Sequence, residues 1–237
     1  DERYTLLFNG EIYNYKELRN ELKTRGILFV TESDTEVLFR LLIYDGTNCL
    51  ERLNGMFAFF FLDRLNKNFI ISRDRLGIKP FYYKFENKSL YFGSEIDSIC
   101  RLSRSSIEID DNAVRMFLNF QYIPTPYSIL DKVLKLPPGS YIKSNISDLA
   151  KTFLPDPVYY WDAYNEIQKS EKSNISTNLE DLLRNSVEKH LQADVPLGLF
   201  LSSGVDSSLL TGIINKYFSK EQIFNFFTVA FNEKTDS

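Results

Sequence analysis

One segment limits the fold of this chain more than any other: a run of serine and glycine between an apolar strand pattern and a helix pattern. The apolar run covers residues 197–201, the serine and glycine run covers 202–208, and apolar residues then recur at helical spacing up to Tyr217. A further apolar run over residues 224–231 has the length of a strand. Strand, loop, helix and strand in this order predict a βαβ unit with parallel strands. We therefore expect residues 176–237 to be the start of an α/β domain with a parallel sheet.

The serine and glycine run predicts an anion site. It places hydroxyls and unpaired backbone N–H groups at the positive N-terminus of a helix. The Lys-Ser/Thr ending of a Walker A loop is missing, so transfer of a γ-phosphate is not indicated. Asp206 would repel phosphate oxygens unless a divalent cation lay between them, so we expect magnesium pyrophosphate as the ligand.

Residues 202–207 resemble the loop of the ATP pyrophosphatase (PP-loop) superfamily, which holds the pyrophosphate of ATP while a carboxylate is adenylated. The resemblance implies ATP and Mg²⁺ as cofactors, with Asp206 as the magnesium ligand. Ser203 stands where the family usually has glycine, which would cost about 1 kcal/mol if the position needed a positive φ. For Leu201 and Val229, the apolar residues at the strand ends, core packing is the alternative role. The implied ATP and pyrophosphate ligands are Leu201, Ser202, Ser203, Gly204, Val205, Asp206, Ser207 and Val229.

The first part of the chain alternates short β-like runs with a few helices. Strands are predicted over residues 4–8, 57–63, 69–73, 81–85 and 90–93, with hairpin turns at 64–67 and 86–88. Capping-box patterns at Asn14, Ser33 and Thr177 predict three helices. Polar, proline-bearing sequence then places a linker at 166–175. We expect an α+β domain with antiparallel sheet over residues 1–165.

A glutamine site is suggested by the residues after the first strand and at the start of the second helix. The ammonium of glutamine needs carboxylates, and attack on its side-chain amide needs oxyanion donors. Asn9 and Gly10 could supply a side-chain and a backbone N–H, and Glu11 and Asp34 could supply the carboxylates. Taken alone, the same residues also suit a hairpin turn and a helix dipole partner.

The surrounding sequence resembles the glutaminase domain of the glutamine-hydrolysing asparagine synthetase family. The matching sequence segments occur in the same order as in the family, over residues 9–14, 33–36, 53–59, 73–83, 136–139 and 160–161. The resemblance implies the four-layer αββα fold of N-terminal nucleophile hydrolases, followed by a PP-loop synthetase domain. It implies that Asn9 and Gly10 form the oxyanion hole, and that Glu11 and Asp34 bind glutamine together with them. We interpret residues 73–83 as a structural hairpin.

Together, the two resemblances predict formation of L-asparagine from L-aspartate, ATP and L-glutamine by way of a β-aspartyl-AMP intermediate. One alternative is a related amidotransferase acting on another carboxylate, for example on a polysaccharide precursor. A second is a non-catalytic amidotransferase-like binding protein. The residues after Ser237 and those before Asp1 would separate these three interpretations.

The composition of the chain limits the classes of partner and the cellular compartment that we expect. The net charge is −4 with acidic and basic residues mixed, so we expect small-molecule partners and neither nucleic acid nor membrane. Two cysteines without metal-ligand spacing suit a reducing compartment, and we expect a cytoplasmic location. We also allow for a homodimer.

The chain starts on Asp1 and stops soon after a strand pattern, so we expect a fragment cut at both ends. The family's nucleophile is an N-terminal cysteine whose own α-amine serves as base. Cys49 and Cys100 lie inside apolar stretches and have no free amine, so neither is expected to replace it. We therefore expect the fragment alone not to hydrolyse glutamine.

Overall fold

The computed structural model describes residues 2–103, 108–150, 154–170, 178–192, 196–218 and 224–229. The chain divides into two compact units, Asp1–Lys169 and Ser170–Ser237. The predicted linker 166–175 begins inside a helix, α5 (Ala163–Ser170), and residues 171–175 lie outside the described residues. Asp162 explains this helical start, because its carboxylate accepts a hydrogen bond from the backbone N–H of Asn165.

The larger unit contains two antiparallel sheets. The first has the strand order β1-β2-β3-β7-β8 and the second has the order β5-β4-β6. Their bounds are β1 (Tyr4–Ile12), β2 (Gly55–Asp63), β3 (Asn68–Arg73), β4 (Tyr82–Glu86), β5 (Ser89–Gly93), β6 (Leu134–Lys135), β7 (Ser140–Asn145) and β8 (Val158–Tyr159). The hairpins β2–β3 and β4–β5 confirm the predicted turns at 64–67 and 86–88.

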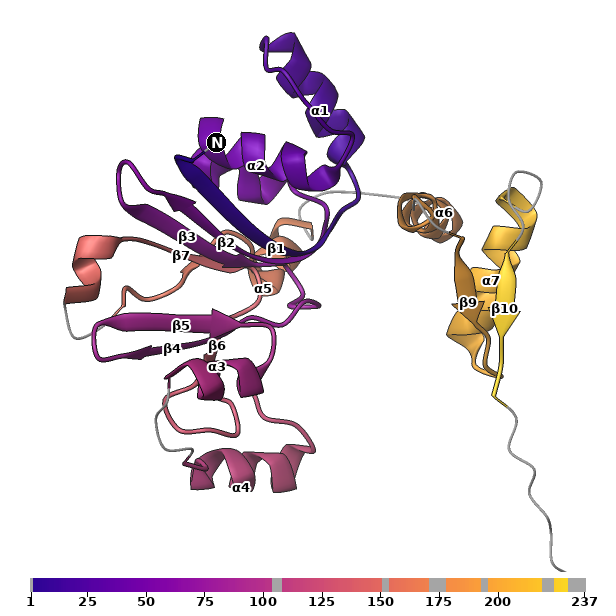
Figure 1. Ribbon diagram of the computed structural model, residues 1–237. Coiled ribbons are helices and arrows are strands. Elements are labelled where there is room, and N and C mark those ends of the chain that lie inside the picture. The colour runs from indigo at the N-terminus through magenta and orange to yellow at the C-terminus, as the bar shows by residue number, and fades with distance from the viewer. Residues whose placement is uncertain are drawn as a thin grey trace, which may run out of the picture. The chain divides into compact units, whose positions relative to one another are not determined.

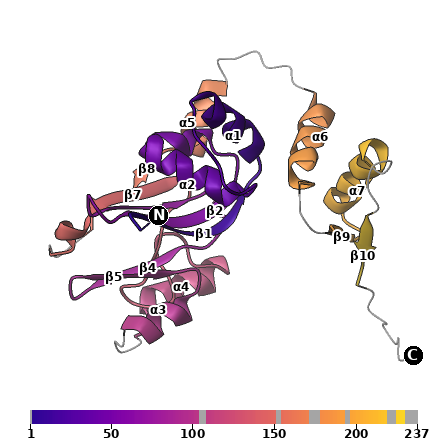
Figure 2. The same cartoon turned by 45° about the horizontal axis from the view of Figure 1, so that its top comes forward.

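Helices cover the outer sides of the two sheets (Figure 1). α1 (Tyr15–Thr24) and α2 (Asp34–Tyr44) lie on the first sheet, α3 (Ile96–Ser103) packs on the second, and α4 (Asp111–Phe120) lies beyond α3. Short 3₁₀ turns, η1 (Gly46–Arg52) and η2 (Ile146–Ala150), complete the unit. The layer order is helix, sheet, sheet, helix, which Figure 2 shows from a second direction, and it confirms the predicted αββα arrangement.

The alternation of side chains along β2 builds two cores. Phe57, Phe59 and Phe61 point to the helices, whereas Ala58 and Phe60 point to the second sheet. Between the sheets the rings of Phe60 and Phe92 stack with their centroids 4.4 Å apart. Each fully buried phenylalanine contributes roughly 1.5–3 kcal/mol relative to an exposed one. The inner core therefore fixes the spacing of the two sheets.

Two local expectations in this unit need correction. The first strand continues to Ile12, four residues past the predicted end, because its end pairs with Gly55. Asn14 occupies the N-cap of α1 but makes no cap hydrogen bond. Its side chain instead accepts from the Asn54 N–H at 2.9 Å and donates to the Arg52 carbonyl at 3.0 Å. Tertiary contacts to the start of β2 outcompete the local cap.

The smaller unit contains the predicted βαβ arrangement. β9 (Gly198–Phe200) and β10 (Asn225–Phe227) are parallel, and α7 (Val205–Tyr217) connects them. α6 (Leu179–His190) packs on α7 around Val187, Ile213 and Ile214. Asn178 caps α6 by accepting from the Glu180 N–H. The predicted cap Thr177 lies outside the described residues, as does the end of the predicted strand 224–231.

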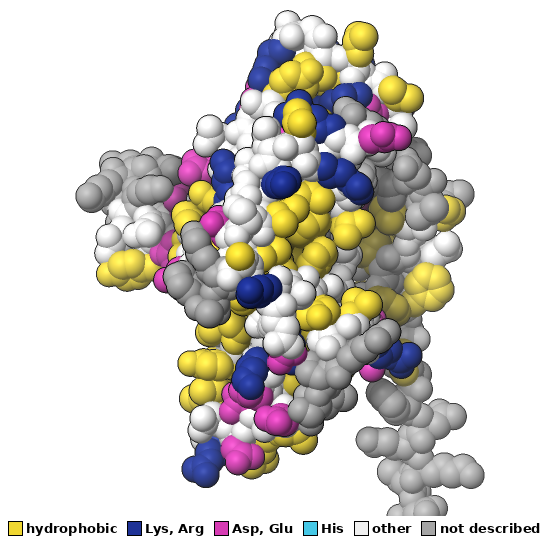
Figure 3. All heavy atoms as spheres, turned by 60° about the vertical axis from the view of Figure 1, so that its left-hand side comes forward, with side chains coloured by type: hydrophobic (Ala, Val, Ile, Leu, Met, Phe, Trp, Pro, Cys, Tyr) yellow, Lys and Arg dark blue, Asp and Glu magenta, His cyan; other side chains and the backbone are white. Residues whose placement is uncertain are grey.

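Figure 3 shows hydrophobic side chains gathered near the middle of one face of the molecule, with acidic and basic side chains around them. Within the described ranges, no helix is long and apolar enough to cross a membrane.

Candidate functional site

The end of β1 presents backbone N–H groups to an open sheet edge. β1 is a terminal strand of its sheet among the described strands, with β2 as its only neighbour. The Tyr13 N–H bonds to the Asn54 carbonyl, and the Arg3 carbonyl accepts from Arg64, so odd-numbered residues face β2. Because backbone N–H groups of an antiparallel strand alternate in direction, the N–H of Gly10 points to the open edge.

Asp34 lies at the same edge. Its Oδ2 atom accepts a hydrogen bond of 2.9 Å from the Ile12 N–H, two residues beyond Gly10. Asp34 is the first residue of α2, where a carboxylate also interacts favourably with the helix dipole. The structure therefore brings Asp34 to the strand that carries Asn9, Gly10 and Glu11.

Asn9 points into a cavity between the two sheets. Its Nδ2 atom donates a hydrogen bond of 2.9 Å to Ser94 Oγ, a residue that no sequence pattern indicates. The cavity has a volume of about 260 Å³ and is lined by Leu7, Phe8, Asn9, Ala58, Phe59, Phe60, Phe81, Phe92, Gly93 and Ser94. The side chain of Asn9 is thus held by the second sheet, which only the tertiary structure reveals.

Gly10 has no room for a side chain. A Cβ atom at this position would lie 2.1 Å from the Met56 carbonyl oxygen and 2.6 Å from the Phe57 Cα atom. Gly10 pairs with Phe57 across the β1–β2 ladder. In antiparallel sheets, pairs without mutual hydrogen bonds bring their Cα atoms to about 4.5 Å, which explains the close approach.

Glu11 interacts electrostatically with the neighbouring Tyr13. Burial, followed by the negative charges of Glu11 and Asp74, raises the pKa of Tyr13. The negative potential at this end of β1 is therefore felt by a buried neighbour.

Asp74 organises the loop that follows β3. Its carboxylate is buried and accepts backbone N–H groups from four residues: Phe57, Leu76, Ile78 and Lys79. Arg73 closes the other side by donating to the carbonyls of Lys79, Leu136 and Gly77. Burial lowers the pKa of this guanidinium. The predicted hairpin over residues 73–83 is therefore wrong: these residues form a hydrogen-bonded connection between β3 and β4, which lie in different sheets.

Cys49 does not have the surroundings of a nucleophile. Cys49 is fully buried, and this burial raises the pKa of its thiol to about 12. Its Sγ donates to the Gly46 carbonyl at 3.1 Å. Cys100 is half-buried on α3, and both cysteines are free of disulfide bonds.

In the smaller unit, the serine and glycine loop folds around Ser207. The Ser207 Oγ atom accepts from the Ser202 N–H at 3.2 Å and lies 2.9 Å from Ser202 Oγ. The Gly204 N–H donates to Ser202 Oγ, and Gly204 is the N-cap of α7. The loop is therefore pre-shaped at the N-terminus of a thirteen-residue helix.

Ser203 fits this loop without backbone strain, because it is absent from the non-glycine residues with positive φ. Leu201 and Val229 follow β9 and β10, so both lie at the carboxyl ends of the parallel strands together with the loop. Val205 is 81% and Val229 74% exposed, which leaves both free to contact a ligand.

Asp206 is exposed in the first turn of α7. Within the part of the chain that the structure describes, no three His, Cys, Asp or Glu side chains group closely enough to hold a metal ion. A magnesium ion at Asp206 would therefore take most of its ligands from phosphate and water, as is usual for Mg²⁺.

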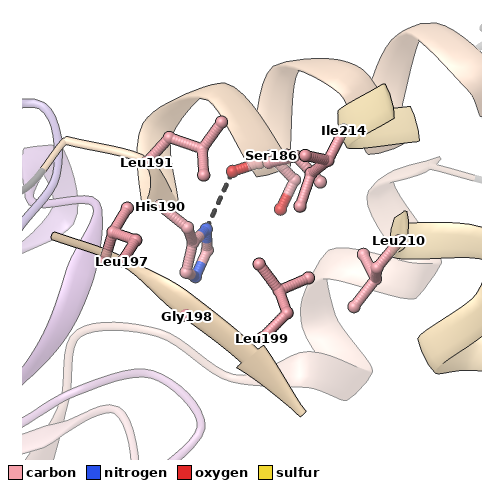
Figure 4. A pocket seen from close by; sticks show the side chains of 9 residues that line it. Ser186, His190, Leu191, Leu197, Gly198, Leu199, Leu210 and Ile214 are labelled. Carbon is pink, nitrogen blue, oxygen red and sulfur yellow. Dashed lines mark hydrogen bonds between the residues drawn. The ribbon is translucent and has the colours of Figure 1, made fainter. Parts of the chain in front are cut away.

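A larger cavity of about 400 Å³ lies between α6, α7 and β9 (Figure 4). Leucine and isoleucine side chains line most of it, together with the single histidine of the chain. His190 Nδ1 is 2.8 Å from the Ser186 carbonyl oxygen, one helical turn earlier. None of the predicted nucleotide ligands lines this cavity.

Family models match both parts of the chain. The model for a glutamine amidotransferase domain matches residues 1–154, and the model for asparagine synthase matches residues 178–237.

Curated relatives match nearly the whole chain. The glutamine-hydrolysing asparagine synthetase 1 of Bacillus subtilis strain 168 is 35% identical over 95% of this chain and 35% of its own length. The putative glutamine-hydrolysing asparagine synthetase 2 of Methanocaldococcus jannaschii is 33% identical over 98% of this chain and 44% of its own length. The chain thus spans between a third and a half of the length of these relatives.

Among solved structures, the glutamine phosphoribosylpyrophosphate amidotransferase of Bacillus subtilis is similar at 14% identity with a TM-score of 0.48. The similarity covers 95% of this chain and 45% of that one.

Proposed function

The chain belongs to the glutamine amidotransferase family, and from this premise we propose that the full-length protein is a glutamine-dependent asparagine synthetase. One observation carries the proposal: an amidotransferase domain and the start of an asparagine synthase domain follow each other on one chain. The relatives that match nearly the whole chain are named glutamine-hydrolysing asparagine synthetases.

The amidotransferase half would release ammonia from L-glutamine. The Gly10 N–H at the open edge of β1 and the amide of Asn9 would stabilise the oxyanion that forms on the substrate amide. Glu11 and Asp34 would bind the glutamine ammonium. Burial disqualifies Cys49 as nucleophile, so the proposal requires another cysteine of the full-length protein in that role.

The synthetase half would activate L-aspartate. A side-chain carboxylate oxygen attacks the α-phosphorus of ATP and pyrophosphate leaves; ammonia then attacks the acyl carbon and AMP leaves. Residues 202–207 would hold the pyrophosphate through hydroxyls, through backbone N–H groups and through the dipole of α7. Mg²⁺ at Asp206 would supply the charge that lets a carboxylate lie beside pyrophosphate.

The two free cysteines suit a reducing compartment, so we place the protein in the cytoplasm. A homodimer stays a prediction, which sedimentation of the full-length protein checks.

Pyrophosphate release by the full-length protein tests the function. We expect aspartate-dependent release from ATP with glutamine, and also with ammonium alone. If pyrophosphate appears with ammonium but not with glutamine, the amidotransferase half does not work. Absence of aspartate-dependent release from both nitrogen sources would refute the assignment, and release with another carboxylate would redirect it.

A further inference from the structure

The side chain of Asp74 contacts β2. This strand carries none of the predicted glutamine ligands, but it pairs with β1 and lies against Gly10. Asp74 Oδ2 accepts from the Phe57 N–H at 3.2 Å, and the Asp74 N–H donates to the Phe57 carbonyl at 2.7 Å. Phe57 is therefore held on its β3 side through both of its backbone polar groups.

On its β1 side, the backbone of Phe57 packs closely against Gly10. Because both polar groups of Phe57 face β3, the pair Gly10–Phe57 has no mutual hydrogen bonds and belongs to the narrow type. The 2.6 Å separation between a Cβ placed on Gly10 and the Phe57 Cα atom expresses the same closeness. Any lateral shift of Phe57 is thus transmitted to the backbone of Gly10 by direct contact.

The position of Phe57 depends on the Asp74 carboxylate, which is buried away from water. Asp74 is 1% exposed, and each of its oxygens accepts two N–H groups: Oδ1 from Leu76 and Ile78, and Oδ2 from Phe57 and Lys79. An amide in place of the carboxylate would turn an N–H₂ group toward two N–H donors, whichever way it rotated. One pair of bonds would be lost, and buried donors would be left unsatisfied.

We propose that Asp74 is a positioning residue for glutamine hydrolysis, which sets the location of the Gly10 N–H through Phe57. The inference rests on the proposed function, in which that N–H stabilises the oxyanion. An oxyanion donor acts only at hydrogen-bond distance from the charge that develops, so a small displacement lowers turnover more than substrate binding.

The test compares Asp74→Asn with Asp63→Asn in the full-length protein. Asp63 lies on the same strand pair at its other end and also accepts two backbone N–H groups, from Leu65 and Asn66. We expect Asp74→Asn to lower kcat for glutamine hydrolysis by about tenfold or more while KM changes less than about twofold. Asp63→Asn keeps the wild-type kcat. Ammonium-dependent asparagine formation reports the integrity of the second unit and stays unchanged in both variants.

A second variant, Asp74→Glu, keeps the charge and all acceptors but changes their reach. If Asp74→Asn does not fold, Asp74→Glu is assayed in its place. We expect it to lower kcat less than Asp74→Asn would, at unchanged KM. Wild-type kcat in Asp74→Glu, an equal loss in Asp74→Asn and Asp63→Asn, or a loss confined to KM would overturn the inference. A wild-type protein that hydrolyses no glutamine would instead refute the proposed function, and the inference with it.

Discussion

Gly10 is a residue whose identity follows from its neighbours on the next strand. The Met56 carbonyl and the Phe57 Cα atom occupy the space that a Cβ would need. The sequence indicated Gly10 only through a resemblance, because an Asn-Gly pair also suits a hairpin turn. The direction of its N–H and the contact behind it depend on pairing with a strand more than forty positions away, which local sequence cannot reveal.

We predict that Gly10→Ala lowers the free energy of unfolding by about 1–3 kcal/mol, because the added methyl group forces β1 and β2 apart. Glutamine hydrolysis should fall sharply, whereas the ammonium-dependent reaction continues. Thermal unfolding and the two assays measure these effects. Gly212→Ala is the control: its Cβ meets nothing within 4 Å in the interior of α7, and alanine there should add about 0.5–1 kcal/mol. Wild-type stability of Gly10→Ala would contradict the packing argument.

At the scale of elements, strands with apolar alternation and tight turns were predictable, whereas β7 was not. Its sequence begins and nearly ends with serine, and Ser140 and Ser144 are buried. The Ser72 hydroxyl bonds the Ser140 carbonyl, so β7 is held partly by polar contacts that hydropathy patterns miss. Likewise, Asp74 could be assigned to a turn from sequence, but its bond to Phe57 seventeen positions earlier could not.

The start of α2 depends on Glu36. Ser33 accepts from the Glu36 N–H at 3.2 Å, which confirms the predicted cap. The Glu36 carboxylate does not return to Ser33 but accepts from the N–H groups of Val30 and Thr31. Burial alone would raise its pKa, but these hydrogen bonds and Arg40 outweigh burial and lower the pKa from 4.5 to about 2.

Glu36 should therefore make stability depend on pH in the acid range. Its folded pKa lies below the unfolded value, so its contribution is complete above about pH 4.5 and is lost as the pH falls toward 2. The side chain is 11% exposed, and the full shift corresponds to about 3 kcal/mol at most. Urea unfolding between pH 2 and about 6 measures the slope. Glu36→Gln should flatten it, whereas replacement of the exposed Glu17 by Gln should not; equal slopes in all three proteins would refute the assignment.

At the scale of the whole molecule, two units with different architectures carry the residues of the two proposed chemistries. The αββα unit carries Asn9, Gly10, Glu11 and Asp34, and the βαβ unit carries the serine loop. The α+β class of the first unit and the βαβ order of the second were predictable from sequence patterns, whereas the αββα layering was implied only by the family resemblance. The bonds within the loop were not, because Ser202 and Ser207 meet only after the chain has turned.

Substitutions in the two units should separate the two activities. Asp34→Asn should raise KM for glutamine about tenfold, since a charged ligand of the ammonium is lost, and leave ammonium-dependent synthesis unchanged. Ser207→Ala should lower aspartate-dependent pyrophosphate release about tenfold or more with either nitrogen source. Thr211→Ala, which removes a hydroxyl bonded to the Ser207 carbonyl, is its control. If Asp34→Asn impaired the ammonium reaction as strongly as the glutamine reaction, the division would be wrong.

The outward N–H groups of β1 also bear on how this chain behaves in a test tube. A nine-residue strand at the edge of a sheet is a template for backbone pairing with another strand, and Leu7 on it is 55% exposed. Residues 1–237 made as a separate polypeptide should thus self-associate as concentration rises, and Leu7→Lys should improve their solubility by discouraging intermolecular β-pairing.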